Sequence, residues 1–208
     1  MRRRIGTILL VAGSAALVWC ASVWISATLF QKYEGWRWNA KHSAAGQASN
    51  AASIGPPAPA ANTLSAPKLH DVIAWLEVPR LRISTAVLEG DDSLALRLGA
   101  GHIPGTPLPG SAGNVGIAAH RDSFFRSLAG IEPQDRIRLR TPQGDWNYTV
   151  ESTRIVQPSK VGVLANSRQS ELTLVTCYPF FYIGAAPKRF VVRARQAPPQ
   201  TLARSTVE

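Results

Sequence analysis

One cysteine, one histidine and one arginine occupy positions from which the chain could build a nucleophilic site. Cys177 ends the alternating run Leu-Thr-Leu-Val-Thr-Cys at residues 172–177, and a proline follows two residues later. This pattern predicts a strand that stops at the thiol, because proline cannot donate to a strand ladder. His120 ends a second short apolar run, and Arg189 begins a third. We therefore expect three polar side chains at strand ends, where a sheet holds a side chain rigidly and still exposes it.

These three residue types suit acyl transfer through a covalent intermediate. A cysteine thiolate is a nucleophile, and a nearby imidazolium both stabilises it and donates a proton to a leaving amine. An arginine stays protonated and donates hydrogen bonds to a developing oxyanion or a substrate carbonyl. Each residue alone also has a structural interpretation: Cys177 as a buried packing residue, His120 as a structural histidine and Arg189 as a surface charge. The presence of all three favours the catalytic interpretation.

The same stretches resemble the signature of the sortase family. The resemblance lies in Thr-Leu-Val-Thr-Cys at residues 173–177, in the strand-terminal His120 far upstream and in Arg189 at the head of the last strand, which occur in the family's order. The neighbouring sequences Cys-Tyr-Pro-Phe and Ala-Pro-Lys-Arg-Phe look most like those of the class D sortases. The resemblance extends over residues 70–196.

Sortases are membrane-anchored cysteine transpeptidases, so the resemblance implies a reaction and a role for each residue. The cysteine attacks an LPxTG-like sorting signal of a secreted protein after the threonine, forms a thioacyl enzyme and passes the acyl group to an amine on the cell envelope or on another protein. By this resemblance Cys177 is the nucleophile, His120 the acid and base, and Arg189 the group that binds the oxyanion or positions the substrate. Thr176 is a further candidate for substrate binding.

Two other functions remain open at this point. A thiol hydrolase would use the same residues with water as the acceptor, whereas a non-catalytic envelope-binding barrel would use none of them. The sorting motif itself depends on loop contacts, which we expect chiefly from residues 101–113 and 157–170.

The elements that must carry these residues are mostly short strands. β-branched content, alternation and bounding Gly or Pro residues predict strands at residues 72–78, 81–88, 115–120, 136–140, 146–156, 172–177 and 190–195. Short helices are expected at residues 92–98, with Asp91 or Asp92 as the N-cap, and at residues 123–128, whereas residues 101–113 are expected to form a loop. The sequence therefore predicts an all-β fold: a closed or nearly closed barrel of seven or eight strands with one or two short helices.

An apolar segment near the N-terminus predicts a transmembrane helix. Three arginines at residues 2–4 precede an uncharged stretch, residues 5–31, which is longer than the roughly 20 apolar residues that a membrane-spanning helix needs. By the positive-inside rule, the N-terminus is cytoplasmic and the remaining chain lies outside the cytoplasm, at the cell membrane. The tryptophans expected to anchor the far interface are Trp24, Trp36 and Trp38.

Other N-terminal signals fit the sequence less well. A cleaved signal peptide would use a weak site that ends at Ala27, but the apolar stretch exceeds the usual length of a signal-peptide core. A lipoprotein modified at Cys20 is disfavoured because the two residues before it are not small. We therefore expect a retained anchor at residues 1–31, a disordered Ala/Pro/Ser-rich stalk at residues 32–69, a catalytic barrel at residues 70–196 and a loose tail at residues 197–208.

The basic composition is explained without nucleic acid. The chain has 208 residues and a formal net charge of +10, and about half of this excess lies before residue 70, where membrane topology accounts for it. The arginines of the predicted barrel alternate with apolar residues, as on a solvated sheet face, and no nucleic-acid recognition motif is present. We expect a membrane and secreted proteins as partners, and no nucleic acid.

Neither a disulfide nor a metal site is expected. Cys20 lies within the apolar segment, so the geometry of a disulfide with Cys177 is implausible. Glu89, Asp91 and Asp92 form an acidic cluster, but this is equally typical of a helix start, and we expect no metal and no cofactor. Linker or surface positions are expected for the remaining histidines, His42, His70 and His102.

Overall fold

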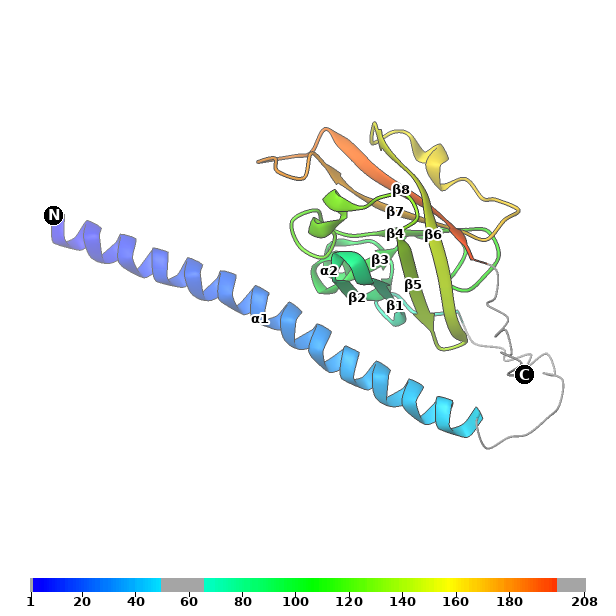
Figure 1. Ribbon diagram of the computed structural model, residues 1–208. Helices are drawn as coiled ribbons and strands as arrows, with labels where there is room; N and C mark the ends of the chain where they lie inside the picture. The colour runs from blue at the N-terminus through cyan, green and yellow to red at the C-terminus, as the bar shows by residue number, and fades with distance from the viewer. Residues whose placement is uncertain (1, 50–65, 198–208) are drawn as a thin grey trace, which may run out of the picture.

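The computed structural model describes residues 2–49 and 66–197, which form a long N-terminal helix and an eight-stranded barrel (Figure 1). The helix is α1 (Arg2–Ser49). The strands are β1 (Val72–Val78), β2 (Ile83–Glu89), β3 (Ala100–His102), β4 (Asn114–Ala118), β5 (Arg136–Thr141), β6 (Gly144–Val156), β7 (Glu171–Tyr178) and β8 (Lys188–Gln196). They close in the order β1-β2-β3-β4-β7-β8-β6-β5, which confirms the predicted all-β barrel.

The short helical segments lie in the connections between strands. Besides α1, the described residues form one α-helix, α2 (Ser93–Leu98), and three 3₁₀ turns, η1 (Pro79–Leu81), η2 (Arg126–Gly130) and η3 (Val161–Leu164). Helix α2 begins as predicted, because the Asp92 carboxylate accepts hydrogen bonds from the backbone N–H groups of Leu94 and Ala95. It ends at Gly99. The carboxylate also contacts the ring of His70, at 2.6 Å between Oδ2 and Nε2.

Alternation along the strands builds the core. On β5, Ile137 and Leu139 are fully buried while Arg136 and Arg138 are exposed. The same period of two recurs around the barrel, so that one side chain in two faces inward. Large side chains packed inside come from β1, β4, β6, β7 and the connection before η2: Leu76, Ile117, Tyr148, Leu172, Leu174 and Phe125.

Two parallel pairings bring distant segments together. Strand β4 pairs in parallel with β7, and β2 pairs in parallel with β3, whereas the other neighbours are antiparallel. Parallel neighbours end at the same edge of a sheet. The C-terminal ends of β4 and β7 therefore meet, and β8 returns from that edge beside β7.

Part of the expected loop at residues 101–113 is a strand. Residues of β3 pair with β2 on one side and β4 on the other, and a side chain at Gly101 would place a Cβ 2.4 Å from the Gly90 carbonyl oxygen. Three residues, two of them small, carry too little alternation to be recognised. The surface position expected for His102 is also wrong: its ring is 2% exposed, and its Nδ1 lies 2.9 Å from Glu89 Oε2.

Helix α1 extends beyond the segment expected to cross the membrane. Residues 32–49 are helical rather than disordered, and residues 50–65 lie outside the described residues. The helix packs against the barrel wall: Gln31 donates to the Leu98 carbonyl at 2.5 Å and accepts from the Ala86 N–H at 3.1 Å. Trp38 is buried against Trp75, so this side chain faces the barrel and not a membrane interface. These contacts supply the burial that an isolated helix lacks.

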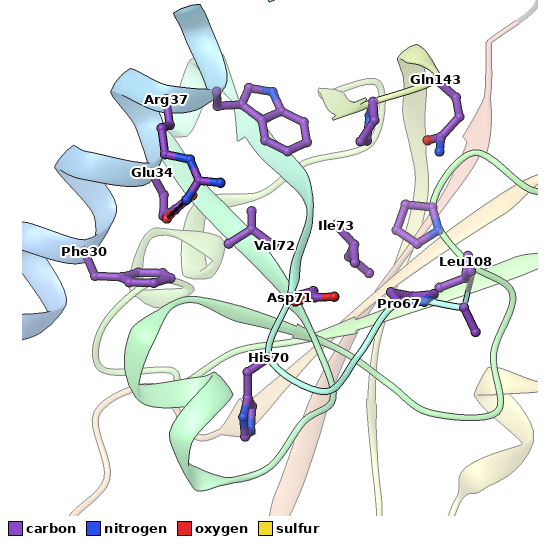
Figure 2. Close-up of a pocket in the computed structure, with 14 residues that line it drawn as sticks. Phe30, Glu34, Arg37, Pro67, His70, Asp71, Val72, Ile73, Leu108 and Gln143 are labelled. Carbon is purple, nitrogen blue, oxygen red and sulfur yellow. Dashed lines mark hydrogen bonds and ion pairs between the residues drawn. The ribbon is translucent and has the colours of Figure 1, made fainter. Parts of the chain in front are cut away.

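A cavity of about 560 Å³ opens between α1 and the barrel (Figure 2). Phe30 and Arg37 of the helix face Val72 and Ile73 across it. None of the residues predicted to be catalytic lines this cavity.

The side chains of residues 4–22 of α1 are exposed. By length and composition, the segment Arg4–Ala40 is able to cross a membrane.

Candidate active site

Cys177 lies near the end of β7, on the outer face of the barrel. The inward side chains of this strand, Leu172, Leu174 and Thr176, are buried in or beside the core, whereas Val175 and Cys177 are only partly buried. This arrangement follows from the alternation in the sequence, because successive side chains of a strand point to opposite faces. The thiol is therefore held by a rigid strand and remains accessible.

Arg189 lies directly across the β7–β8 ladder from Cys177. The two residues are Cα partners in the antiparallel register, so their side chains share the outer face. The guanidinium Nη1 donates to the carbonyl oxygens of Ala186 at 3.3 Å and Lys188 at 3.1 Å. These bonds hold one end of the fork against the β7–β8 connection. The Arg189 side chain is partly exposed, and its planar guanidinium carries further N–H donors besides those on Nη1.

His120 reaches the same edge from β4. In the parallel register Ala118 pairs with Val175, and the Ala119 N–H donates to the Val175 carbonyl at 3.2 Å. Two residues after these partners, the chains arrive at His120 and Cys177. The histidine is exposed, and it follows the strand end rather than belonging to the strand.

Thr176 connects these two chain segments. Its side chain is 3% exposed, and its Oγ1 donates to the Ala119 carbonyl at 2.7 Å. The hydroxyl therefore ties β7 to the residue that precedes His120. A contact with substrate would compete with this bond, so the geometry favours a positioning role for Thr176 over direct substrate binding.

One groove contains all four residues predicted for the site. Its volume is about 370 Å³, and it includes Cys177, His120, Arg189 and Thr176. Apolar side chains from β4, β7 and β8 form its floor, and the β6–β7 connection with η3 covers it. The apolar lining comes from Ala118, Val175, Val191, Val161, Val163 and Leu164.

Asn114 supports this groove and was not singled out in the sequence. It is fully buried, and its amide nitrogen donates to the carbonyl oxygens of Val163 at 3.1 Å and Ala165 at 3.2 Å. Its side-chain oxygen accepts from Thr173 Oγ1 at 2.7 Å. One side chain thus fastens the cover of the groove to two barrel strands. An asparagine at the start of a strand carries no local signal of this function.

Arg121 was also not predicted. Its Nη2 donates to the carbonyl oxygens of Tyr182 at 2.8 Å and Gly184 at 3.0 Å, and its guanidinium lies 5.7 Å from the centre of the Tyr182 ring. The residue after His120 therefore braces the β7–β8 connection. The connection that leads to Arg189 is therefore held both by Arg121 and by Arg189 itself.

Comparisons with known proteins agree with this architecture. The family model described as the sortase domain matches residues 76–197. Sortase D of Bacillus subtilis is 31% identical over 131 residues, covering 62% of this chain and 66% of that protein. Sortase A of Listeria monocytogenes is 27% identical over 110 residues, covering 51% of this chain and 49% of that protein. The matched segment thus spans less than two thirds of the length of these curated relatives.

Solved structures show the same fold. A sortase D5 transpeptidase of Clostridium perfringens has a TM-score of 0.60 and 27% identity, covering 65% of this chain and 85% of that one. Sortase C-1 of Actinomyces oris has a TM-score of 0.57 and 25% identity, covering 62% and 75%. Because the family model covers more than half of the chain, and the barrel has the same architecture as these structures, the chain belongs to the sortase family.

Proposed function

We propose that this protein is a membrane-anchored cysteine transpeptidase that acts on secreted proteins carrying a C-terminal LPxTG-like sorting signal. The observation that carries the proposal is the arrangement of Cys177 and Arg189 as direct cross-strand partners, with His120 at the same edge and in the same groove. A nucleophile, a proton carrier and a permanent cation are the groups that acyl transfer from a peptide requires.

In the proposed reaction, the Cys177 thiolate attacks the carbonyl carbon of the threonine of the signal, whose bond to the next residue's nitrogen is the one that breaks. The guanidinium of Arg189 donates hydrogen bonds to the oxyanion that forms. As the C–N bond breaks, the imidazolium of His120 gives its proton to the leaving amine, and a thioacyl enzyme remains. An acceptor amine then attacks this thioester, the neutral imidazole takes the amine proton, and the thiolate leaves.

The groove supports an extended peptide as the substrate. Its lining is mostly apolar, as a Leu-Pro segment requires, and the same groove contains Cys177, His120 and Arg189. Thr176 acts here as a positioning residue, because its bond to the Ala119 carbonyl holds the chain that leads to His120.

Membrane anchoring is supported by α1. The side chains of residues 4–22 are exposed and predominantly apolar, and a helix of this length crosses a bilayer. We propose a retained single-pass anchor with the N-terminus in the cytoplasm and the barrel outside it. The barrel would then lie close to the membrane, since α1 packs on its wall through residues 30–39.

The proposal is tested by incubating the full-length chain in detergent micelles with an LPxTG reporter peptide, with and without an added amine, and analysing the products by mass spectrometry. We expect a thioacyl adduct on Cys177 and transfer of the acyl group to the amine. Cys177→Ala abolishes both products, whereas Cys20→Ala, the matched control at the other cysteine, leaves them unchanged. Arg189→Lys keeps the charge but loses the fork, and we expect it to lower kcat/KM at least about tenfold.

The other outcomes separate the alternatives. Release of the free acid despite excess amine indicates a hydrolase. Absence of cleavage and of a thioacyl adduct across varied signals contradicts the catalytic proposal and favours an envelope-binding barrel.

A further inference from the structure

The β7–β8 connection is built on a rigid base. At its two ends, Tyr178, Phe180 and Phe190 pack together, with ring centres 6.1 Å (Tyr178–Phe180), 6.4 Å (Tyr178–Phe190) and 5.2 Å (Phe180–Phe190) apart. Arg121 hydrogen-bonds two of its carbonyl oxygens from the side. The aromatic cluster and the Arg121 bonds therefore fix the connection relative to the barrel.

Three consecutive large side chains at the tip are exposed. The exposed fraction is 82% for Phe181, 47% for Tyr182 and 101% for Ile183. None of the three lines the groove that contains Cys177. A contiguous apolar tip on a fixed loop indicates a contact surface, because exposing adjacent large apolar side chains to water is unfavourable.

Cations surround this tip. The Arg126 guanidinium lies 5.9 Å from the centre of the Phe181 ring, and Arg121 lies over Tyr182. Lys188 is exposed at the end of the connection, and Asp122 is the acidic residue beside the arginines in sequence. An apolar tip with basic neighbours matches the interface of an anionic bilayer, where rings and aliphatic groups enter and cations meet phosphates.

The direction of the tip fits the same partner. Helix α1 is fastened to the barrel wall, so its axis has a defined orientation relative to the barrel. Figure 1 shows the β7–β8 connection, in orange, extending from the barrel toward the side on which the apolar N-terminal half of α1 lies. A bilayer crossed by that half of the helix would therefore lie on the side toward which this connection points.

We propose that Phe181, Tyr182 and Ile183 form a second membrane contact, entering the outer interface of the bilayer that α1 crosses. The inference rests on the anchoring proposed above. Together the helix and the tip would hold the barrel to the membrane at two points. Because Cys177 and Arg189 lie at the two ends of this connection, the active site would then lie near a substrate that is still close to the membrane.

The test uses the full-length chain in nanodiscs of phosphatidylcholine and phosphatidylglycerol, with an environment-sensitive fluorophore on a single cysteine. The probe position is Ile183→Cys, in a chain that also carries Cys20→Ser and Cys177→Ser. The matched control is Val161→Cys in the same background, because Val161 is also apolar and 72% exposed, but lies on η3. A third chain, Cys177→Ser alone, carries the fluorophore on the native Cys20 and reports on the anchor.

We expect the label at Ile183 to shift its emission to the blue and to be quenched several-fold more by spin-labelled lipids than the label at Val161. Quenching at Ile183 should weaken when phosphatidylglycerol is omitted, because the cations then lose their phosphate-rich partner.

A water-like signal at Ile183 beside a lipid-embedded Cys20 overturns the contact and leaves the anchor intact. A water-like signal at Cys20 overturns the anchoring on which the inference rests. A label at Ile183 that stays in water until a sorting peptide is added assigns the tip to substrate instead.

Discussion

Asn114 offers the sharpest test of how the groove is held together. Its amide nitrogen donates to two carbonyl oxygens of the covering loop, and its oxygen accepts from Thr173. Asn114→Asp keeps the shape and the acceptor but removes both donors. Two lost hydrogen bonds amount to about 2 kcal/mol, and a carboxylate placed beside two carbonyls in a buried position adds to this, so we expect a total of about 2–4 kcal/mol at neutral pH.

The loss should appear first as local opening of the covering loop. Hydrogen exchange measured by mass spectrometry on peptides that span residues 157–170 reports on that opening, and 2–4 kcal/mol corresponds to exchange that is about 30-fold to 1,000-fold faster. In the peptide-cleavage assay, KM should rise more than kcat falls, because the loop contributes the groove wall and not the reacting groups.

Thr173→Val is the matched control. It removes the third hydrogen bond of the same amide, at a cost of about 1 kcal/mol, but leaves both bonds to the loop in place. Exchange of residues 157–170 should therefore change much less than in Asn114→Asp. If the two variants accelerate exchange equally, or if Asn114→Asp leaves it unchanged, the assignment of Asn114 as the fastening of the loop is refuted.

Three further predictions concern the rest of the barrel. Thr176→Val should cost about 1 kcal/mol of stability. It should lower kcat more than it raises KM, because the bond that it removes positions the chain before His120. Equal effects on kcat and KM would contradict that role. The Arg80 guanidinium, by hydrogen bonding, lowers the pKa of Asp135, so this carboxylate stabilises the fold above its unfolded pKa of about 3.9 and the stabilisation is lost as the pH falls through the lower folded value. Asp135→Asn should therefore be less stable at neutral pH and show a flatter acid limb in urea unfolding. Burial raises the pKa of Tyr148 to about 12, so the fold loses stability as the pH rises from about 10 toward that value, and Tyr148→Phe should remove this part of the alkaline loss measured by denaturant unfolding.

Much of the chain's local structure could be predicted from its residues. The alternation at residues 136–140 and 172–177 identifies both strands and the face to which each side chain points, because a strand has a period of two and water and core select different residue types. Asp92 and Gly99 delimit a helix by satisfying its free backbone groups. The order of the cysteine, histidine and arginine motifs predicted the sortase family.

The tertiary structure alone decides which of these elements become neighbours. Nothing near Cys177 in the sequence specifies that β4 pairs with β7 in parallel and brings His120 to the same edge, because such distant pairing partners are chosen by closure of the whole barrel. The burial of His102 depends on β3, whose three residues form a strand only because β2 and β4 flank them. The burial of Trp38 beside Trp75 has the same origin. The sequence of α1 predicts an anchor and a linker, but it does not show that the barrel wall offers an apolar surface on which the helix packs.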